Sequence, residues 1–90
     1  MVKSRMSLGF RKLLGKLPAA VQKEARQAYL MFAENPHHPG LGFKCPRTLP
    51  TIRSVRIGLG HRALGRVGGD TVMWFWIGTH AEYTALLKKL

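Results

Sequence analysis

Apolar residues in the first part of the chain recur at steps of three and four, which is the spacing of an amphipathic helix. One such stripe lies in residues 8–17, where two glycines weaken the helix and keep it short. A longer stripe in residues 19–34 follows Pro18, which suits a first helical turn, and ends before Pro36. The sequence therefore predicts a helix hairpin whose buried stripes are Phe10, Leu13, Leu14, Leu17 and Val21, Ala25, Ala28, Phe32.

Beyond residue 41 the pattern changes to short strands separated by glycine turns. A first strand is predicted at 42–45, where Pro46 limits it. Longer strands follow at 52–58, 61–67 and 71–77, with glycine-containing turns between them. Such spacing is typical of an antiparallel meander. Residues 1–6 are either an arm or a short edge strand.

The predicted strand at residues 71–77 contains the run VMWFWI, and a helix over residues 79–90 follows it. Because the run is apolar on both faces, the strand should be central and mostly covered. Trp74 and Trp76 should share one face and pack in the core, although either indole could instead stack on a nucleobase. Thr79 and Glu82 have the spacing of a capping box at the start of the helix. The predicted fold is α+β, a single domain over residues 1–90 with a helix hairpin, an antiparallel sheet and a closing helix.

Charge narrows the class of partner. Fifteen Lys and Arg residues face four acidic residues, for a formal net charge of +11. Such a surface attracts polyanions, whether nucleic acid, an acidic protein or an anionic membrane surface, or it is a solvated face that favours solubility. The longest apolar run has six residues, whereas a membrane helix needs roughly 20. Cys45 is the only cysteine and is interpreted as a buried or bystander thiol, which favours a reducing cytoplasmic location.

The loop at residues 58–60 sets the register of the first hairpin. A three-residue loop with Gly60 in the left-handed region places Arg56 directly opposite Arg62, with Ser54, Leu64 and Arg66 on the same face. Like charges so placed are destabilising, and an anion held between two arginines would relieve them. Two alternatives stay open: both side chains splay into water, or a two-residue turn pairs Arg56 with Ala63 instead.

His80 stands where the last strand gives way to the last helix. A helix N-terminus and nearby arginines both favour the neutral imidazole, which is the form that a general base requires. The alternative is a first-turn residue with no chemical role, beside a capping box formed by Thr79 and Glu82. Neighbouring His37 and His38 lack a third ligand at useful spacing, so the sequence predicts no metal site and no cofactor.

Three segments resemble a known family. They are SVRIGLGHRALG, WFWIGTHAEYTALL and the upstream pattern LP..VQ..A..AY..F..NPHHPGL.FK. Together they resemble the RelE/ParE superfamily of type II toxins over residues 8–88, and most closely a branch with an Ile-Gly-[Ser/Thr]-His-x-x-Tyr-like C-terminal segment. The resemblance implies a toxin that a co-expressed, acidic and partly disordered antitoxin neutralises. RelE-type members cleave mRNA on the ribosome without metal, whereas ParE-type members share the fold and poison DNA gyrase.

The resemblance also implies roles for particular residues. The basic strand positions of the family match Arg56 and Arg62, which would hold the scissile phosphate. Its C-terminal histidine and aromatic match His80, as the acid or base, and Tyr83, which would orient it or stack on a base. The alternative for Tyr83 is a place in a core stripe of the last helix, with Leu86, Leu87 and Leu90. The chain departs from the family at His61, where related chains usually have Tyr. Further out, nucleic-acid contacts are expected from Lys44, Arg53 and Arg66.

Three alternative functions are consistent with these residues and with the resemblance. The first is an mRNA endoribonuclease toxin, and the second is a ParE-like gyrase inhibitor in which His80 is dispensable. The third is a basic nucleic-acid-binding module without toxicity, which would bind in a salt-sensitive way and need no antitoxin.

Overall fold

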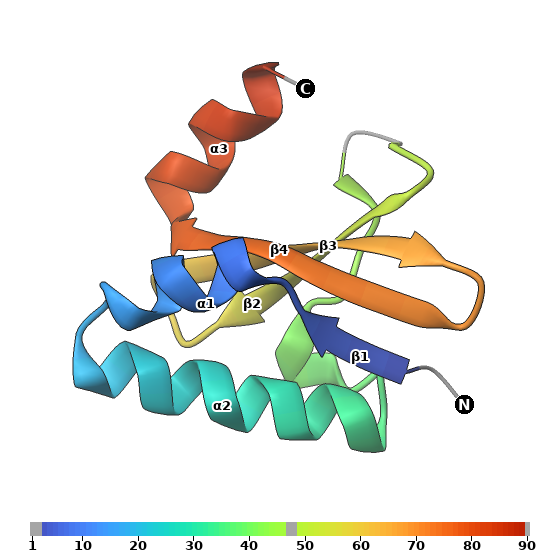
Figure 1. Ribbon diagram of the computed structural model, residues 1–90, viewed down its shortest axis with the longest axis horizontal. Helices are drawn as coiled ribbons and strands as arrows, with labels where there is room; N and C mark the ends of the chain where they lie inside the picture. The colour runs from blue at the N-terminus through green and yellow to red at the C-terminus, as the bar shows by residue number, and fades with distance from the viewer. Residues whose placement is uncertain (1–2, 47–48, 90) are drawn as a thin grey trace.

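The computed structural model describes residues 3–46 and 49–89. Along these residues the elements are β1 (Lys3–Met6), α1 (Leu8–Gly15), α2 (Ala19–Glu34), the 3-10 turn η1 (Pro39–Leu41), β2 (Ile52–Ile57), β3 (His61–Gly68), β4 (Thr71–Thr79) and α3 (His80–Lys89). Helix α2 lies under one side of the sheet with α1 beside β4, and α3 rises from the other side (Figure 1). The α+β class and the helix hairpin are as the sequence predicted.

The sheet is mixed, with strand order β1-β4-β3-β2. Strands β2, β3 and β4 form the predicted antiparallel meander, but β1 pairs with β4 in parallel at the edge. The first residues thus form the short edge strand that the sequence analysis gave as one of two alternatives, and its parallel pairing was not predicted. Two side-chain hydrogen bonds hold β1 at this edge. The Trp74 indole donates to Ser4 Oγ at 2.6 Å, and the Tyr29 hydroxyl donates to the Ser4 carbonyl at 2.8 Å.

The strand predicted at residues 42–45 is reduced to one bridge. Lys44 pairs with Ser54 of β2 through two backbone hydrogen bonds of 3.1 and 2.8 Å. Turn η1 ends just before it, and Pro46 has no backbone N–H to extend the pairing.

The turn between β2 and β3 differs in detail from the prediction. Gly58 has a φ of +59°, whereas Gly60 does not lie in the left-handed region. The left-handed glycine was therefore assigned to the wrong end of the loop. A side chain at Gly58 would also collide with the Glu24 carboxylate of α2. Because the loop still has three residues, the predicted strand register holds.

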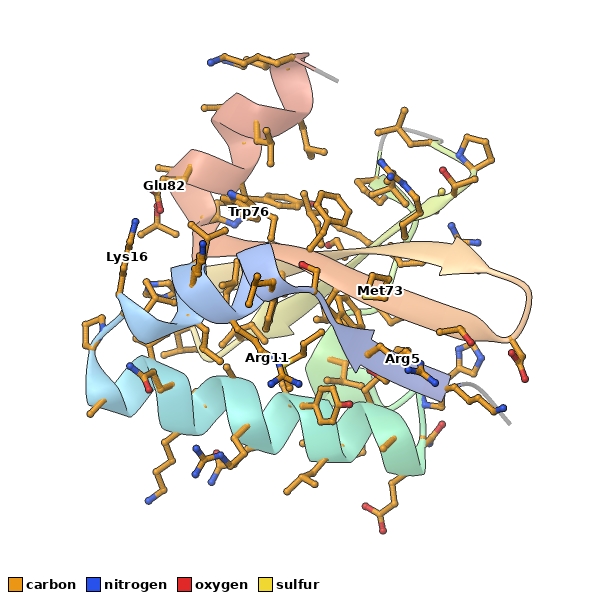
Figure 2. All side chains as sticks on the ribbon, viewed as in Figure 1. Arg5, Arg11, Lys16, Met73, Trp76 and Glu82 are labelled. Atoms are coloured by element: carbon orange, nitrogen blue, oxygen red, sulfur yellow. The ribbon has the colours of Figure 1, made fainter. Side chains whose placement is uncertain are left out.

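A β-bulge separates the two tryptophans. Opposite β3, Leu64 pairs with Trp76 while the next residue, Gly65, pairs with Trp74, so Phe75 is the extra residue. Trp74 consequently packs with the core on the α1/α2 side, and Trp76 packs on the α3 side (Figure 2). The prediction that both share one face was wrong, since strict alternation fails at a bulge. Core packing was predicted correctly for Trp74, which is 3% exposed.

The sheet thus separates two apolar clusters. The larger one lies between the sheet and α1/α2, and the smaller one lies under α3 and contains Ile52, Leu64, Tyr83 and Leu87. Among the helices described, none is both long and apolar enough to cross a membrane.

Candidate functional site

Two arginines face each other on the α3 side of the sheet. The backbone register pairs Arg56 with Arg62 and Ile57 with His61, as the sequence predicted. The two side chains nevertheless have different environments: Arg56 is exposed, whereas Arg62 is only 6% exposed. The two guanidinium groups therefore lie in different environments, one buried and one at the surface, an arrangement that the sequence analysis did not consider.

Polar groups of the protein hold the Arg62 guanidinium in place. Its Nε and Nη2 atoms donate to Ser54 Oγ at 3.1 and 2.6 Å, and Nη2 also donates to the Gly42 carbonyl at 3.1 Å. The guanidinium carbon lies 5.1 Å from the centre of the Tyr83 ring, within cation–π range. Burial lowers the pKa of Arg62, contact with Tyr83 opposes this, and the charge of Arg56 lowers it further. No carboxylate is among these partners.

Tyr83 links the buried arginine to the last helix. It is 4% exposed, and its hydroxyl donates to Ser54 Oγ at 3.1 Å. Its ring centre lies 5.9 Å from that of His80, with the planes inclined by 37°. Tyr83 therefore lies below the surface, beside His80 and against Arg62.

His80 is the first residue of α3 and is exposed. The predicted capping box is present: the Thr79 amide donates to Glu82 Oε1 at 2.8 Å, and the Glu82 amide donates to Thr79 Oγ1 at 3.1 Å. Hydrogen bonding of the carboxylate to the Thr79 amide, and secondarily to the Thr79 side chain, holds the pKa of Glu82 below its usual value. The His80 amide donates to the Gly60 carbonyl at 2.9 Å, which ties the start of α3 to the β2–β3 turn.

Arg56, Arg62 and His80 line one surface hollow with a volume of about 310 Å³. Leu59 and His61 complete its lining. An imidazole beside two guanidinium groups can exchange a proton next to a bound phosphate, which is the combination that RNA cleavage by the 2′-hydroxyl requires. The structure thus brings together three of the four predicted catalytic residues, with Tyr83 packed behind them. We name this hollow the His80 pocket.

The three predicted outer contacts lie apart from the His80 pocket. Lys44 is exposed beside β2, and Arg66 is exposed near the end of β3, on the α3 side. Arg53 alternates with Ser54 and so belongs to the other face, where its Nη1 donates to the carbonyls of Pro50 and Ile52. The Arg53 side chain is therefore engaged locally by hydrogen bonds to backbone carbonyls.

Sequence reasoning missed the groups that hold Arg62. Ser54 was placed on the correct face, and its position opposite an arginine pair was the available signal for a buried hydrogen-bond acceptor. The Gly42 carbonyl gave no such signal, because a loop of unknown path presents it. Among the described residues, no group of three or more His, Cys, Asp or Glu side chains is arranged to hold a metal ion. Cys45 is exposed and its thiol donates to the Leu49 carbonyl.

Residues 19–85 match the family model described as the ParE-like toxin domain. The chain belongs to this family. The match includes all of the His80 pocket and the residues that hold Arg62. A search of curated protein sequences found no match.

Solved toxin structures share the fold of this ParE-like toxin domain. A chain of the RelB–RelE antitoxin–toxin complex from Methanococcus jannaschii matches with a TM-score of 0.73 and 16% identity, over 91% of this chain and 96% of that one. The isolated RelE toxin of E. coli matches with a TM-score of 0.67 and 16% identity, over all of both chains. The YoeB/ParE toxin from Agrobacterium tumefaciens matches with a TM-score of 0.65 and 18% identity, over 88% and 99% of the two chains.

The ParE-like toxin domain described here is therefore a toxin of the RelE/ParE type, the class found in toxin–antitoxin systems. This assignment disfavours a basic binding module without toxicity.

Proposed function

We propose that this toxin is an mRNA endoribonuclease that acts on ribosome-bound message in the cytoplasm. The observation that carries the proposal is the His80 pocket, in which an exposed imidazole shares a hollow with Arg56 and Arg62. A net charge of +11 favours a polyanionic substrate.

In the proposed reaction, the 2′-hydroxyl attacks the adjacent phosphorus, and the bond from phosphorus to the departing 5′-oxygen breaks. His80 serves as the base that accepts the 2′-hydroxyl proton, and the departing 5′-oxygen takes a proton from solvent water. Arg56 and Arg62 stabilise the negative charge that develops on the phosphoryl oxygens. The products are a 2′,3′-cyclic phosphate and a 5′-hydroxyl, and no metal ion is needed because side chains supply both the base and the positive charge.

The two arginines have different tasks in this proposal. Arg62 is held by three hydrogen bonds and by the Tyr83 ring, so its charge is fixed before substrate arrives. Arg56 is exposed and free to close on the phosphate. A buried guanidinium with neutral partners retains its full charge for an incoming anion, which strengthens electrostatic stabilisation. Tyr83 positions Arg62 and His80 rather than contacting RNA.

We further propose that an acidic antitoxin binds this toxin. The solved RelE-type structures include complexes with a RelB antitoxin, from Methanococcus jannaschii and from E. coli. A basic surface of this density favours an acidic, partly disordered partner that folds over it.

The chemistry of the cut ends tests the proposal. Messenger RNA from cells that express the toxin should carry new 2′,3′-cyclic phosphate and 5′-hydroxyl ends. Intact messenger RNA in growth-arrested cells would contradict an endoribonuclease. The second candidate, inhibition of DNA gyrase, is favoured by the match to a ParE-like family model. It predicts lost supercoiling activity in the same cells, and equal toxicity when His80 is replaced.

A further inference from the structure

A second surface feature lies on the α3 side of the sheet, away from the His80 pocket. The guanidinium carbon of Arg66 lies 5.4 Å from the centre of the Phe75 ring. Met73 pairs directly with Arg66 across the strands and is 39% exposed, which makes it one of four large apolar side chains exposed among the described residues. These three residues line a hollow of about 320 Å³. We name them the Arg66 platform.

The β-bulge explains why the platform exists. Phe75 is the extra residue opposite Leu64 and Gly65, and it packs with the α3-side cluster instead of alternating to the other face. The ring is therefore brought under the Arg66 side chain. Without the bulge, Phe75 and Trp76 would point to opposite sides of the sheet.

We propose that the Arg66 platform binds an unpaired nucleobase of single-stranded RNA. A guanidinium that lies over an aromatic ring is held flat and presents its outer face, on which a base can stack. Met73 offers an apolar contact to the edge of that base. The positive charge of Arg66 suits an RNA ligand and disfavours an uncharged apolar one. Because the hollow has no second arginine close by in its lining, stacking on a base fits it better than capture of a phosphate.

The position of the platform suits a base on the same RNA strand as the cut site. Arg62 and Arg66 point to the same face of β3 and are four residues apart, which is about 13 Å along a strand. Leu64 lies between them and is fully buried in the cluster under α3, so an RNA strand with its scissile phosphate in the His80 pocket reaches the platform by passing around α3. In this respect the inference rests on the proposed function and adds a subsite to it.

The test uses matched substitutions that separate stacking from charge. Arg66→Lys keeps the charge but removes the planar group, and Phe75→Leu keeps an apolar side chain but removes the ring. Arg11→Lys is the control, because Arg11 is exposed on α1 (Figure 2). All variants are made with His80→Ala so that RNA is not consumed. Binding of a short single-stranded RNA is measured over a range of salt concentrations, beside an abasic oligomer of equal length and charge.

We expect Arg66→Lys and Phe75→Leu each to bind the base-bearing RNA about ten-fold more weakly than the control does. The slope of log affinity against log salt should not change, since each variant keeps its charge. Binding of the abasic oligomer should equal that of the control. Thermal unfolding of each variant shows whether it is folded, and Arg66→Lys alters only an exposed side chain.

Two results would overturn the proposal that the Arg66 platform binds a nucleobase. Unchanged affinity of both variants for the base-bearing RNA would show that no base stacks there, as expected if a protein partner covers this patch instead. An equal loss of affinity for the abasic oligomer would mean that Arg66 contacts the RNA backbone. The proposed function is tested separately, by expressing the toxin with intact His80 and asking whether messenger RNA is cut. Uncut messenger RNA would contradict the proposed function whether or not the variants differ in RNA binding, so the two failures are distinguishable.

Discussion

Arg56 and Arg62 are directly paired across β2 and β3, yet only Arg56 reaches solvent, while Arg62 donates to Ser54 and to the Gly42 carbonyl. One arginine is thus part of the interior and the other part of the surface. The pairing brings two positive charges to one place without a carboxylate among the hydrogen-bond partners of Arg62. Substrate phosphate supplies the missing negative charge in the proposed reaction.

The difference between the two arginines predicts different costs of substitution. Arg62→Lys should lower the free energy of unfolding by roughly 2 kcal/mol, because a lysine cannot reproduce the bonds of Nε and Nη2. Arg56→Lys should change it by less than about 0.5 kcal/mol, since the side chain is exposed. Urea denaturation of both variants measures these values. Equal losses would show that Arg62 is not held as described.

Tyr83 is predicted to act as a support. Tyr83→Phe removes the hydrogen bond to Ser54 Oγ at 3.1 Å but keeps the ring beside Arg62 and His80. The free energy of unfolding should fall by about 1 kcal/mol. Toxicity in an induced-growth assay should persist in this variant. Loss of toxicity with an unchanged free energy of unfolding would instead give the hydroxyl a direct chemical role.

Glu82 predicts a dependence of stability on pH. Its hydrogen bonds with Thr79 hold the pKa of the folded carboxyl below the ordinary value of 4.5. The folded protein therefore binds fewer protons than the unfolded chain near that pH. The stabilising contribution of the Glu82 carboxylate is thus present above pH 4.5 and is lost as the pH falls through the pKa of the folded protein.

Thermal unfolding across acidic pH measures this contribution. The difference in Tm between wild type and Glu82→Gln should shrink as the solution becomes more acidic. Glu34→Gln, on the exposed last turn of α2, is the charge-matched control and should not reproduce that trend. A Tm difference between wild type and Glu82→Gln that stays constant with pH would show that ionisation of the Glu82 carboxyl does not cause it.

Gly65 is predicted to be required by packing alone. A Cβ at this position would lie 2.8 Å from Trp74 Cε3, and at a similarly close approach to Val72. Gly65→Ala should therefore destabilise the fold by roughly 1–3 kcal/mol through overpacking. Gly68→Ala is the control, because no atom lies within 4 Å of the added carbon. Similar stability of the two variants, measured by chemical denaturation, would contradict the described packing on the α1/α2 side.

Regular patterns along the chain predicted much of the fold. The bounds of α2, the register of Arg56 with Arg62 and the capping box at α3 all followed from spacing and turn chemistry. These features are set by residues close in sequence. The parallel pairing of β1 was missed, since four residues carry no reliable period and the pairing depends on a strand about 70 residues away.

Two features in and near the candidate site could not be predicted from the sequence: the β-bulge in β4 and the burial of Arg62. Strict alternation placed Trp74 and Trp76 on one face, and one extra residue in β4 separates them. The sequence predicted that Arg56, Arg62 and His80 lie close together, but it gave no reason to expect one arginine to be buried and the other exposed. Their difference arises from Ser54 and the Gly42 carbonyl, which tertiary contacts bring to Arg62.

Induced expression of wild type and His80→Ala in bacteria tests most directly whether this toxin cleaves RNA with His80 in its active site. Because His80 is exposed, the substitution should leave the fold intact. The proposed mechanism predicts growth arrest and a fragmented reporter mRNA with wild type, and loss of both with His80→Ala. Arrest that persists in the variant while the reporter mRNA stays intact would contradict it and point to gyrase.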